Sequence, residues 1–502
     1  MVKRNLIANY LGSGWSALMG LVFLPVYIHY LGIEAYGLIG VFASLQVWFL
    51  LLDMGLSHTL NREMARFTAG VHTPQSIHNL LKTMEIIYLG VAVLLALLVT
   101  GFSGWIATDW LKVQTLSTET VTQALTITGF IIAFRWMETL YRSAIIGLQY
   151  QVWLNCATAF FATIRGIGSI AVLAYISPTI QTFFIFQGAV VAIETAVLAR
   201  QTRQFLPVPP QSPRFSVDAL KDIWRFAAGM TTLTLLFTLL TQVDKLLLST
   251  LLPLEQFGYF TLATTLAGAI SVLVGPIVNV ATPRFTELVA AKDEKTLAEQ
   301  YHKFAQLLTI VIAPASLILC FFSREIIFLW TRDVATTAAV APIVSVWVIG
   351  TLLNGMMHIP FIAQFAYGWT RLSVIVNSIA VVIIVPAFLI LVPRYGVMAA
   401  AWIWVAINTG YMLFAISAMH ARILKQEKWR WYRADIFGPL LVGLSFAVGM
   451  ATLAAAQTGM SGLAEAAFLA FGAFLVMIAT AAVTQVGRQA MMQAKNILTK
   501  LI

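Results

Sequence analysis

Charged residues are scarce in this sequence. Asp, Glu, Lys and Arg make up 10% of the 502 residues, whereas hydrophobic residues make up 60%; soluble proteins carry about 25% charged residues. The mean hydropathy of +0.85 excludes an ordinary soluble domain. A bilayer core about 30 Å thick needs roughly 20 apolar residues per helix, and the chain offers many such runs. We therefore interpret the chain as an integral membrane protein.

Cysteine is almost absent, so the sequence has no pattern for a disulfide framework or a cysteine-ligated metal site. The two cysteines, Cys156 and Cys320, both lie in apolar segments, and the seven His are scattered without ligand spacing. We expect no disulfide, no metal site and no cofactor, and we treat both thiols as small apolar side chains. The chain also lacks the G-x-x-x-x-G-K and H-E-x-x-H motifs, and no polar break is long enough for a soluble catalytic domain.

Long apolar runs are what the sequence has instead. They are continuous and about twice as long as the strands of a membrane barrel, so they predict a helical bundle. Lys3 and Arg4 precede a first run that is too long for a signal peptide, and we expect it to be retained as a helix. We predict fourteen transmembrane helices, with approximate spans 6–29, 35–59, 82–103, 121–146, 152–176, 180–200, 223–249, 256–282, 303–328, 336–358, 371–392, 397–420, 435–456 and 464–486.

Basic residues follow the topology of such a bundle. With a cytoplasmic amino terminus, most of the 31 Lys and Arg fall in or beside cytoplasmic segments. The exceptions outside are Lys112, Arg324, Arg332 and Arg394, and those within helices are Arg135, Arg165 and Lys245. This is the positive-inside pattern, so the net charge of +10 reflects topology and not a nucleic-acid partner. Both termini are predicted to be cytoplasmic.

A proline-rich break, "QTRQFLPVPPQSPRFSVDAL", follows the sixth helix and indicates a linker between two halves. The predicted organisation is a first lobe (1–200), a cytoplasmic linker (201–222), a second lobe (223–420), two extra helices (435–486) and a cytoplasmic tail (487–502). Six helices per lobe give both lobes the same orientation, which is the parallel-repeat arrangement of some secondary transporters.

The two lobes share a motif. "LGIEAYGL" after the first helix matches "LPLEQFGYFTL" after the seventh. Glu34 aligns with Glu255, and Gly37 aligns with Gly258, at one offset of 221 residues. The match supports an internal repeat, to which the last two helices do not belong.

Polar residues recur at helical spacing on repeat-matched helices. In lipid such a face should meet protein or water, which predicts an aqueous cavity shared by the two lobes. The alternative is that small and hydroxyl residues only allow close helix packing. The candidate lining residues are Asn9 and Ser16 on the first helix, Thr234, Thr238 and Thr241 on the seventh, and Ser271 and Asn279 on the eighth.

Charges within the bundle gather in the first lobe. Arg135, Glu138 and Arg142 share one face of the fourth helix, while Arg165 and Glu194 lie on the fifth and sixth. One hypothesis is that the guanidinium groups receive an anionic substrate. The other is that the three Arg residues pair permanently with Glu138, Glu194 and Glu85, three charges against three. Both hold if the pairs rearrange on binding.

Three further charges lie in predicted helices. Asp53 is in the inner third of the second helix, and Asp244 and Lys245 lie near the outer end of the seventh. Either carboxylate could titrate and couple transport to an ion, or could serve as a structural cap or ion pair. Both alternatives stay open at this point.

The stretches "PVYIHYLGIEAYGL", "LLDMGLSHTLNREMAR" and "QVDKLLLSTLLPLEQFGYFTLA" resemble the oligosaccharide flippases of the multidrug/oligosaccharidyl-lipid/polysaccharide (MOP) superfamily. The likeness is closest to the Wzx-type O-antigen and polysaccharide translocases. It implies a V-shaped bundle of two lobes whose central cavity is lined by helices one, two, seven and eight. It also implies transport of an undecaprenyl-diphosphate-linked oligosaccharide across a bacterial inner membrane, with a proton or sodium gradient driving return. By position, Asp244 matches the family's acidic residue near the end of helix seven, and Arg62 matches its basic residue after helix two.

We therefore expect a lipid-linked oligosaccharide flippase that works by alternating access. Arg135, Arg165 and Lys245 are the expected headgroup ligands, with Arg62 and Arg284 at the cytoplasmic mouth. Asp53, Glu138 and Asp244 are the candidates for ion coupling. Membrane lipids and polysaccharide assembly proteins are the expected partners.

Three alternatives remain. Two are a flippase for a lipid-linked peptidoglycan precursor and a MATE-like drug antiporter, although an antiporter for cationic drugs should favour acidic cavity residues. The third is a membrane polysaccharide polymerase or ligase, which would need a large external loop that this chain lacks.

Overall fold

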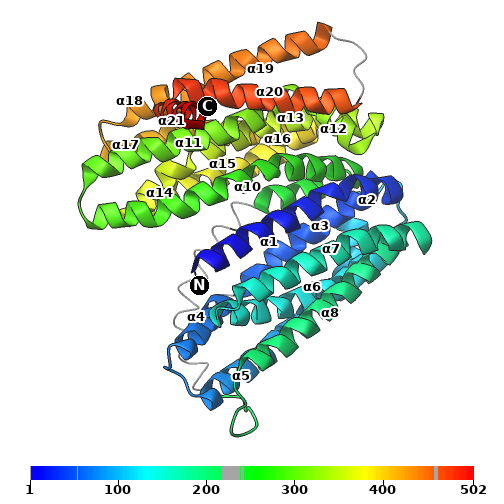
Figure 1. Ribbon diagram of the computed structural model, residues 1–502. Helices are drawn as coiled ribbons and strands as arrows, with labels where there is room; N and C mark the ends of the chain where they lie inside the picture. The colour runs from blue at the N-terminus through cyan, green and yellow to red at the C-terminus, as the bar shows by residue number, and fades with distance from the viewer. Residues whose placement is uncertain (1, 54, 217–237, 239–241, 457–461, 502) are drawn as a thin grey trace. The chain divides into compact units, whose positions relative to one another are not determined.

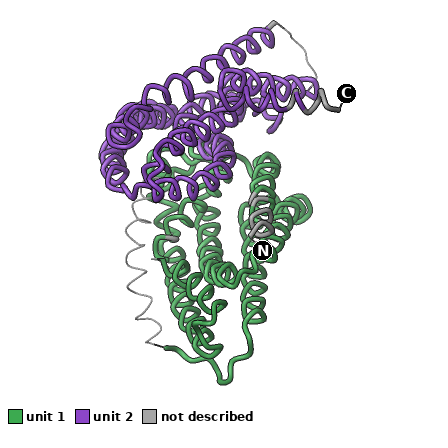
Figure 2. The backbone as a smooth tube through the Cα atoms, turned by 60° about the vertical axis from the view of Figure 1, so that its left-hand side comes forward, with its two compact units in different colours: residues 1–258 green, residues 259–502 purple. Residues whose placement is uncertain are grey.

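The chain folds into helices over most of the residues that the structure describes (Figure 1). This computed structural model describes residues 2–53, 55–216, 238, 242–456 and 462–501. They divide into two compact units, residues 1–258 and residues 259–502 (Figure 2). The expected all-helical fold is confirmed for the described residues, where pairing of extended backbone is limited to an isolated bridge between Lys112 and Pro253.

The first unit contains the helices up to α8 and the first turn of α10. A 3₁₀ turn, η1, extends α3, and a π-helical turn, η2, extends α5. Its helices are α1 (Val2–Val22), α2 (Leu24–Leu31), α3 (Ile33–Phe49), η1 (Leu50–Asp53), α4 (Leu56–Thr68), α5 (Pro74–Trp105), η2 (Ile106–Trp110), α6 (Thr118–Gly147), α7 (Gln151–Tyr175) and α8 (Ile180–Phe205).

The second unit contains the remaining described helices. Its best-buried long helix is α11, which packs against α13, α19 and α20. The helices are α10 (Leu254–Ala290), α11 (Glu294–Phe321), α12 (Ser323–Thr331), α13 (Val334–Met356), α14 (His358–Ala366), α15 (Arg371–Tyr395), α16 (Val397–Gly410), η3 (Tyr411–Ala415), α17 (Ile416–Arg422), α18 (Lys428–Arg430), η4 (Trp431–Phe437), α19 (Gly438–Ala456), α20 (Gly462–Val483) and α21 (Gln485–Leu501).

Hydroxyl and carboxylate side chains define where several helices begin. Thr73, Ser117 and Thr179 cap α5, α6 and α8, and each accepts a hydrogen bond from the backbone N–H three residues later. Asp293 and Asp333 do the same for α11 and α13, at 3.0 and 2.7 Å. Each cap satisfies a backbone N–H that has no partner within the helix. The polar residues in these breaks between apolar runs therefore also mark where the following helices begin.

Twelve of the described helical segments are long and apolar enough to cross a membrane. The helix α6 is not among them because the polar and charged side chains along it lower its mean hydropathy, although its 30 residues would span ~45 Å. Thirteen of the fourteen predicted spans lie mostly in described helices, while the seventh, 223–249, is described only at residue 238 and at 242–249, which are helical. The chain is thus a multi-pass membrane protein, and the total of fourteen spans stays a prediction.

Helix α6 is the centre of the first unit. It packs against α5, α8 and α4. Tyr88 of α5 stacks on Trp136 of α6 with ring centroids 5.2 Å apart, and both side chains are buried. At the other end, Gly147 lies so close to the backbone of Asn61 that a Cβ there would overlap it. This packing holds α6 firmly, so the charged side chains it carries are held in place too.

The proline-rich segment after α8 runs along the first turns of α5. A ring nitrogen of His78 lies 2.9 Å from the carbonyl oxygen of Pro207. Three backbone N–H groups of the segment donate, each at 2.9 Å, to α5 side chains: Gln211 to Gln75, Arg214 to Asn79 and Ser216 to Thr83. The α5 acceptors are four residues apart and share one face of the helix. The linker is therefore fastened to the first unit as far as it is described.

A buried polar cluster ties η4 and α21 to α11 in the second unit. His302 of α11 contacts Asp435 through one ring nitrogen and Glu427 through the other, the latter at 2.8 Å. The side-chain amide of Gln306 donates to Asp435 at 2.8 Å, and its oxygen accepts from the backbone N–H of Val486 at 3.1 Å. His302, Gln306 and Asp435 are buried, and each has a partner, whereas Glu427 is partly exposed. Here the two helices predicted as additions to the lobes are joined to the second unit.

The motif that repeats in the sequence forms a symmetric contact. A Cβ on Gly37 would overlap the carbonyl oxygen of Leu254, and a Cβ on Gly258 would overlap the carbonyl oxygen of Ile33. Ile33 and Leu254 are also 221 positions apart, so each motif copy contacts the other in the same way. Only glycine allows two backbones to approach this closely. The repeat beyond this motif stays a prediction.

The acidic residue of the first motif copy has a separate role. The carboxylate of Glu34 accepts hydrogen bonds from three successive backbone N–H groups, those of Gln114, Thr115 and Leu116, at 2.5, 2.8 and 2.9 Å. A carboxylate in such a cradle satisfies three donors that a short loop could not pair otherwise. The motif thus fixes the connection between η2 and α6.

We expect Gly37→Ala and Gly258→Ala each to lower the free energy of unfolding by about 1–3 kcal/mol, because the added methyl group meets backbone that cannot move aside. Gly90→Ala in α5 is the matched control: its Cβ would meet no atom within 4 Å, and alanine is the better helix former. Thermal unfolding of the purified protein in detergent measures the difference. Equal melting temperatures for Gly37→Ala and Gly90→Ala would contradict the proposed contact.

Candidate functional site

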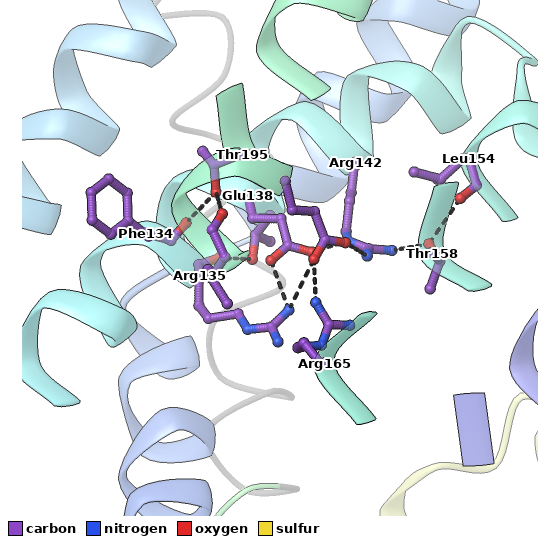
Figure 3. A network of polar contacts seen from close by, with 11 residues as sticks. Phe134, Arg135, Glu138, Arg142, Leu154, Thr158, Arg165 and Thr195 are labelled. Atoms are coloured by element: carbon purple, nitrogen blue, oxygen red, sulfur yellow. Dashed lines mark hydrogen bonds and ion pairs between the residues drawn. The ribbon is translucent and has the colours of Figure 1, made fainter. Parts of the chain in front are cut away.

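Charged side chains from three neighbouring helices converge in the first unit. Arg135, Glu138 and Arg142 project from α6, Arg165 from α7 and Glu194 from α8. Figure 3 shows the guanidinium groups of Arg135 and Arg165 reaching the same carboxylate region from different helices. The expected juxtaposition of Arg135, Glu138 and Arg165 is therefore what the structure shows. We call these five residues the arginine network.

Two buried carboxylates hold the arginine network together. Glu138 accepts from Arg135 at 2.8 Å and from the Nε of Arg142. Glu194 accepts from Nη2 of Arg142 at 2.8 Å and from Arg165, and Nη1 of Arg135 lies 4.0 Å away. The two Glu side chains are only 3% and 1% exposed, whereas those of the Arg residues are 16–27% exposed. The carboxylates therefore form the buried floor and the guanidinium groups face outward.

The network carries one positive charge in excess. The ion-pair hypothesis named Glu85 as the third carboxylate, and that part of the hypothesis is wrong. Glu85 instead accepts from Arg203 at 2.7 Å and from Tyr141 at 3.0 Å. Three guanidinium groups thus share two carboxylates. In an apolar environment an uncompensated cation attracts an anion strongly.

Guanidinium donors remain available on this cluster. Within the described part of the chain, Arg135 and Arg165 each use a single nitrogen for the carboxylates. Arg142 is different, because its three nitrogens bind Glu138, Thr158 and Glu194. Arg142 is thus a structural member of the network, and Arg135 and Arg165 are the members that could bind an incoming anion.

A pocket of 350 Å³ opens onto the network. Its charged and polar lining is Arg135, Glu138, Thr139, Arg142 and Gln46, and apolar side chains such as Trp136 and Phe49 complete it. Pockets of this size, with apolar walls and a few convergent polar groups, are typical of small-ligand sites. Among the described residues, the lining thus includes one guanidinium group with unused donors, that of Arg135, and the fully bonded guanidinium group of Arg142.

The remaining basic candidates already have nearby carboxylates. Arg62 in α4 donates to Glu63 at 2.9 and 2.7 Å. Burial acts to raise the pKa of Glu63, but hydrogen bonds from His72 and Arg62 and the charge of Arg66 bring that pKa below its usual value. Arg284 in α10, part of the second unit, forms an exposed pair with Glu287 at 2.8 Å. Each of the two Arg residues thus pairs with a carboxylate of its own helix.

Asp53 has the contacts of a structural cap. Its carboxylate accepts from the backbone N–H of Ser57 at 3.2 Å and from the Ser57 hydroxyl at 2.7 Å, both in the first turn of α4. The phenol of Tyr88 donates to it as well. The residue is buried, and the donors that it contacts in the described part of the chain are a backbone N–H, a hydroxyl and a phenol. Of the two alternatives for Asp53, the cap is the one that these contacts support.

Asp244 is partly buried, and its carboxylate oxygen Oδ1 is buried without a hydrogen-bond partner among the described residues. The ammonium group of the next residue, Lys245, donates to Gln242 at 3.3 Å. A buried oxygen left without a donor is costly unless a proton or a cation joins it. Asp244 therefore has the local chemistry of an ion-binding group.

The residues expected to line a cavity are only partly accounted for. The Asn9 side chain bonds to Gln151 at 3.1 Å and to Asn155 at 2.5 Å, so it joins α1 to α7. The Ser16 hydroxyl is buried without a hydrogen-bond partner, and Thr238 is buried. Ser271 and Asn279 are exposed on α10, while Thr234 and Thr241 lie outside the described residues. Their role as cavity lining stays a prediction.

The sequence analysis left three members out of the candidate site. Arg142 and Glu194 were recognised as ion-pair partners but not as parts of a binding site, and Thr139 was not considered. Their signals were available, because Thr139 and Arg142 follow Arg135 by four and seven residues on one face of α6. Glu194 could be assigned only once α8 was seen to pack against α6.

Comparison with known proteins finds a family match, a related sequence and solved structures of similar fold. The sequence matches the family model described as "Polysaccharide biosynthesis protein" over residues 2–289. A Shigella flexneri protein named "Putative O-antigen transporter" is 19% identical over 410 residues, which cover 80% of this chain and 94% of that protein.

Solved structures of the MOP superfamily have the same fold. The lipid II flippase MurJ in an inward closed conformation matches with a TM-score of 0.68 and 12% identity, over 94% of this chain and 97% of that one. An inward-facing multidrug resistance MATE family transporter matches with a TM-score of 0.64 and 13% identity, over 83% and 96% of the two chains. The resemblance noted in the sequence is confirmed, and at these identities the structural likeness concerns the fold alone.

We expect Glu194→Gln to lower the free energy of unfolding by about 3–5 kcal/mol. The substitution leaves the network with two positive charges in excess, next to a buried side chain that can no longer neutralise them. Arg135→Gln should cost less, since it brings the network to neutrality. Glu119→Gln, at an exposed site in the first turn of α6, should change stability by no more than about 0.5 kcal/mol. Chemical unfolding in detergent gives the ranking, and a larger loss for Arg135→Gln than for Glu194→Gln would refute the excess-charge account.

Proposed function

The chain belongs to the polysaccharide biosynthesis protein family, and on this premise we propose that it is a flippase for an oligosaccharide linked to undecaprenyl diphosphate. The substrate would be the repeat unit of an O-antigen or of another surface polysaccharide. The chain would carry its headgroup across the bacterial inner membrane by alternating access, with both termini in the cytoplasm. The transport function named for the Shigella flexneri relative supports the proposal.

The observation that carries the proposal is the excess positive charge of the arginine network beside a pocket. A diphosphate-linked sugar is an anion that must leave water, and its crossing is limited by the cost of removing that charge from solvent. Guanidinium groups suit phosphate oxygens because their paired N–H donors match the oxygen spacing. Arg135 has such donors in the lining of the pocket, and Arg165, which does not line the pocket, has them on the adjacent helix α7.

The two carboxylates of the network make this binding reversible. Glu138 and Glu194 neutralise two of the three guanidinium charges and keep all three Arg side chains in place when no substrate is present. An arriving phosphate would then compete with a carboxylate for donors and would not enter an uncompensated positive site. A flippase needs such moderate affinity, because a headgroup bound too tightly would not be released on the other side.

The pairing of Arg62 with Glu63 and of Arg284 with Glu287 limits the role we propose for these residues. Both Arg side chains are about two-fifths exposed, and each is already paired with its own carboxylate. We propose that they raise the local concentration of an anionic headgroup without binding it tightly. Lys245 would join the headgroup ligands only if its contact with Gln242 opens.

Asp244 is our proposed group for ion coupling. Its partnerless oxygen could bind a proton or a sodium ion that moves down its gradient while the empty carrier returns. Glu138 is a weaker candidate because two guanidinium groups already occupy its oxygens. Asp53 is weaker as well, since its oxygens cap α4 and accept from Tyr88.

A flippase for a lipid-linked peptidoglycan precursor and an antiporter for cationic drugs are the competing functions within this fold. The excess positive charge disfavours cationic drugs, which would be repelled from the pocket. It does not separate the two lipid-linked substrates, because both carry a diphosphate. The match to the polysaccharide biosynthesis family favours the oligosaccharide.

Reconstitution tests the function. In proteoliposomes, we expect the purified protein to expose the sugar of a polyprenyl-diphosphate-linked oligosaccharide to a membrane-impermeant reagent. Arg165→Gln should slow this by about tenfold or more, the equivalent of one charge-assisted hydrogen bond. Arg324→Gln, on an exposed site in the second unit, is the charge-matched control and should have no effect. Absence of protein-dependent exposure, or transport of a cationic dye instead, would reject the proposal.

Ion coupling is tested in the same vesicles. With an imposed proton or sodium gradient, the wild-type rate should exceed the rate without a gradient, and Asp244→Asn should remove this difference while leaving downhill exchange intact. The amide keeps the shape of the carboxylate but cannot carry the charge. A gradient-driven rate that persists in Asp244→Asn would rule out this residue as the coupling site.

A further inference from the structure

A second pocket, of 540 Å³, lies where the linker leaves α8 and returns along α5. Its polar lining is His78, Lys82 and Glu85 from α5 and Arg203 from α8. It shares no lining residue with the pocket at the arginine network. The transport mechanism gives it no role.

This linker pocket also has more positive than negative charge. Glu85 is buried and accepts from Arg203 at 2.7 Å and from Tyr141 at 3.0 Å. The ammonium group of Lys82 is 3.9 Å from Glu85, too far for a hydrogen bond, and its side chain is 48% exposed. Two cations therefore face one carboxylate, and the three N–H donors of Lys82 are available.

The walls and the position of the pocket restrict its occupant. Leu206, Pro207, Val208 and Pro213 provide an apolar wall on the linker side, and Val208 is 90% exposed. Arg203 belongs to the last turn of α8, and the membrane-spanning segment ends two residues later at Phe205. A small anion alone would leave the apolar wall exposed to water. An anionic group attached to an organic moiety matches both sides of the pocket.

We propose that the linker pocket binds a phosphate-bearing ligand, with Lys82 and Arg203 on the phosphate oxygens and the proline-rich wall against the attached group. Because the two cations belong to α5 and α8, a phosphate between them bridges the two helices at the point where the linker begins. The ligand thus stabilises the docking of the linker on α5 through Gln75, Asn79 and Thr83. This site is independent of the proposed transport function.

The ligand phosphate has two sources, a membrane lipid headgroup or a soluble phosphate compound, and two arms of one experiment separate them. Hydrogen–deuterium exchange of residues 206–216 is followed in the full-length protein. In the first arm the protein is in detergent and is titrated with inorganic pyrophosphate. In the second arm it is in nanodiscs of phosphatidylglycerol, compared with nanodiscs of phosphatidylcholine.

Slower exchange with pyrophosphate identifies a soluble ligand, and slower exchange only in phosphatidylglycerol identifies a lipid headgroup. In the first arm, Lys82→Gln should raise the pyrophosphate concentration that gives half of the maximal slowing about tenfold. In the second arm, it should abolish the difference in exchange between the two kinds of nanodisc. Lys295→Gln, at an exposed lysine of the second unit, should leave the protection unchanged. Because both lysines are exposed, we expect neither substitution to unfold the protein. An unchanged melting temperature of each variant confirms this.

Two results overturn the proposal. One is that neither pyrophosphate nor phosphatidylglycerol slows exchange of residues 206–216 in the wild-type protein. The other is that the slowing persists at the same concentration in Lys82→Gln and in Arg203→Gln, which would place the phosphate elsewhere. Because the readout is protection of the linker and not transport, neither result depends on whether the chain is a flippase.

Discussion

A charge in an apolar environment must either meet an opposite charge or reach water, and this constraint explains most of the polar architecture of the chain. Glu138 and Glu194 are buried because three guanidinium groups compensate them. Conversely, α6, α7 and α8 pack together around these ion pairs. Asp435 in the second unit is buried as well, and the side chains of His302 and Gln306 contact it. The exposed apolar faces of the other helices need no such arrangement in lipid.

The arginine network has one positive charge more than its carboxylates neutralise. Within this one cluster, the excess distinguishes a residue that serves the fold from those that we propose to bind an anion. A network built only for stability would gain by neutrality, since the unpaired charge contributes nothing to the fold. Arg142 is bonded through all its nitrogens and behaves as a structural residue. Arg135 and Arg165 each bind the carboxylates through one nitrogen, and Arg135 also lines a pocket. The anion site that we propose would therefore use residues that also hold the helices together.

The sequence predicted those features that depend on one helix at a time. Spacing along the chain placed Arg135, Glu138 and Arg142 on one face, and the hydropathy of each run predicted the helices. It could not predict which carboxylate would compensate a given Arg, because that depends on how neighbouring helices are rotated. Glu85 illustrates this limit: it contacts Tyr141, next to Arg142 in sequence, but Tyr141 points to a different neighbouring helix. Asn9 likewise bonds to α7 because of the pairing of α1 with α7.

The contact between Gly37 and Gly258 has a consequence for the origin of the chain. Gly37 and Gly258 meet each other, and each also lies against the carbonyl oxygen of the residue four positions before the other, which is the pattern of an isologous interface in a homodimer. If the predicted repeat arose by gene duplication, a single glycine in a half-length ancestor would have faced its copy in a second molecule. A side chain at that one position would then have produced two clashes, one with each partner's carbonyl oxygen.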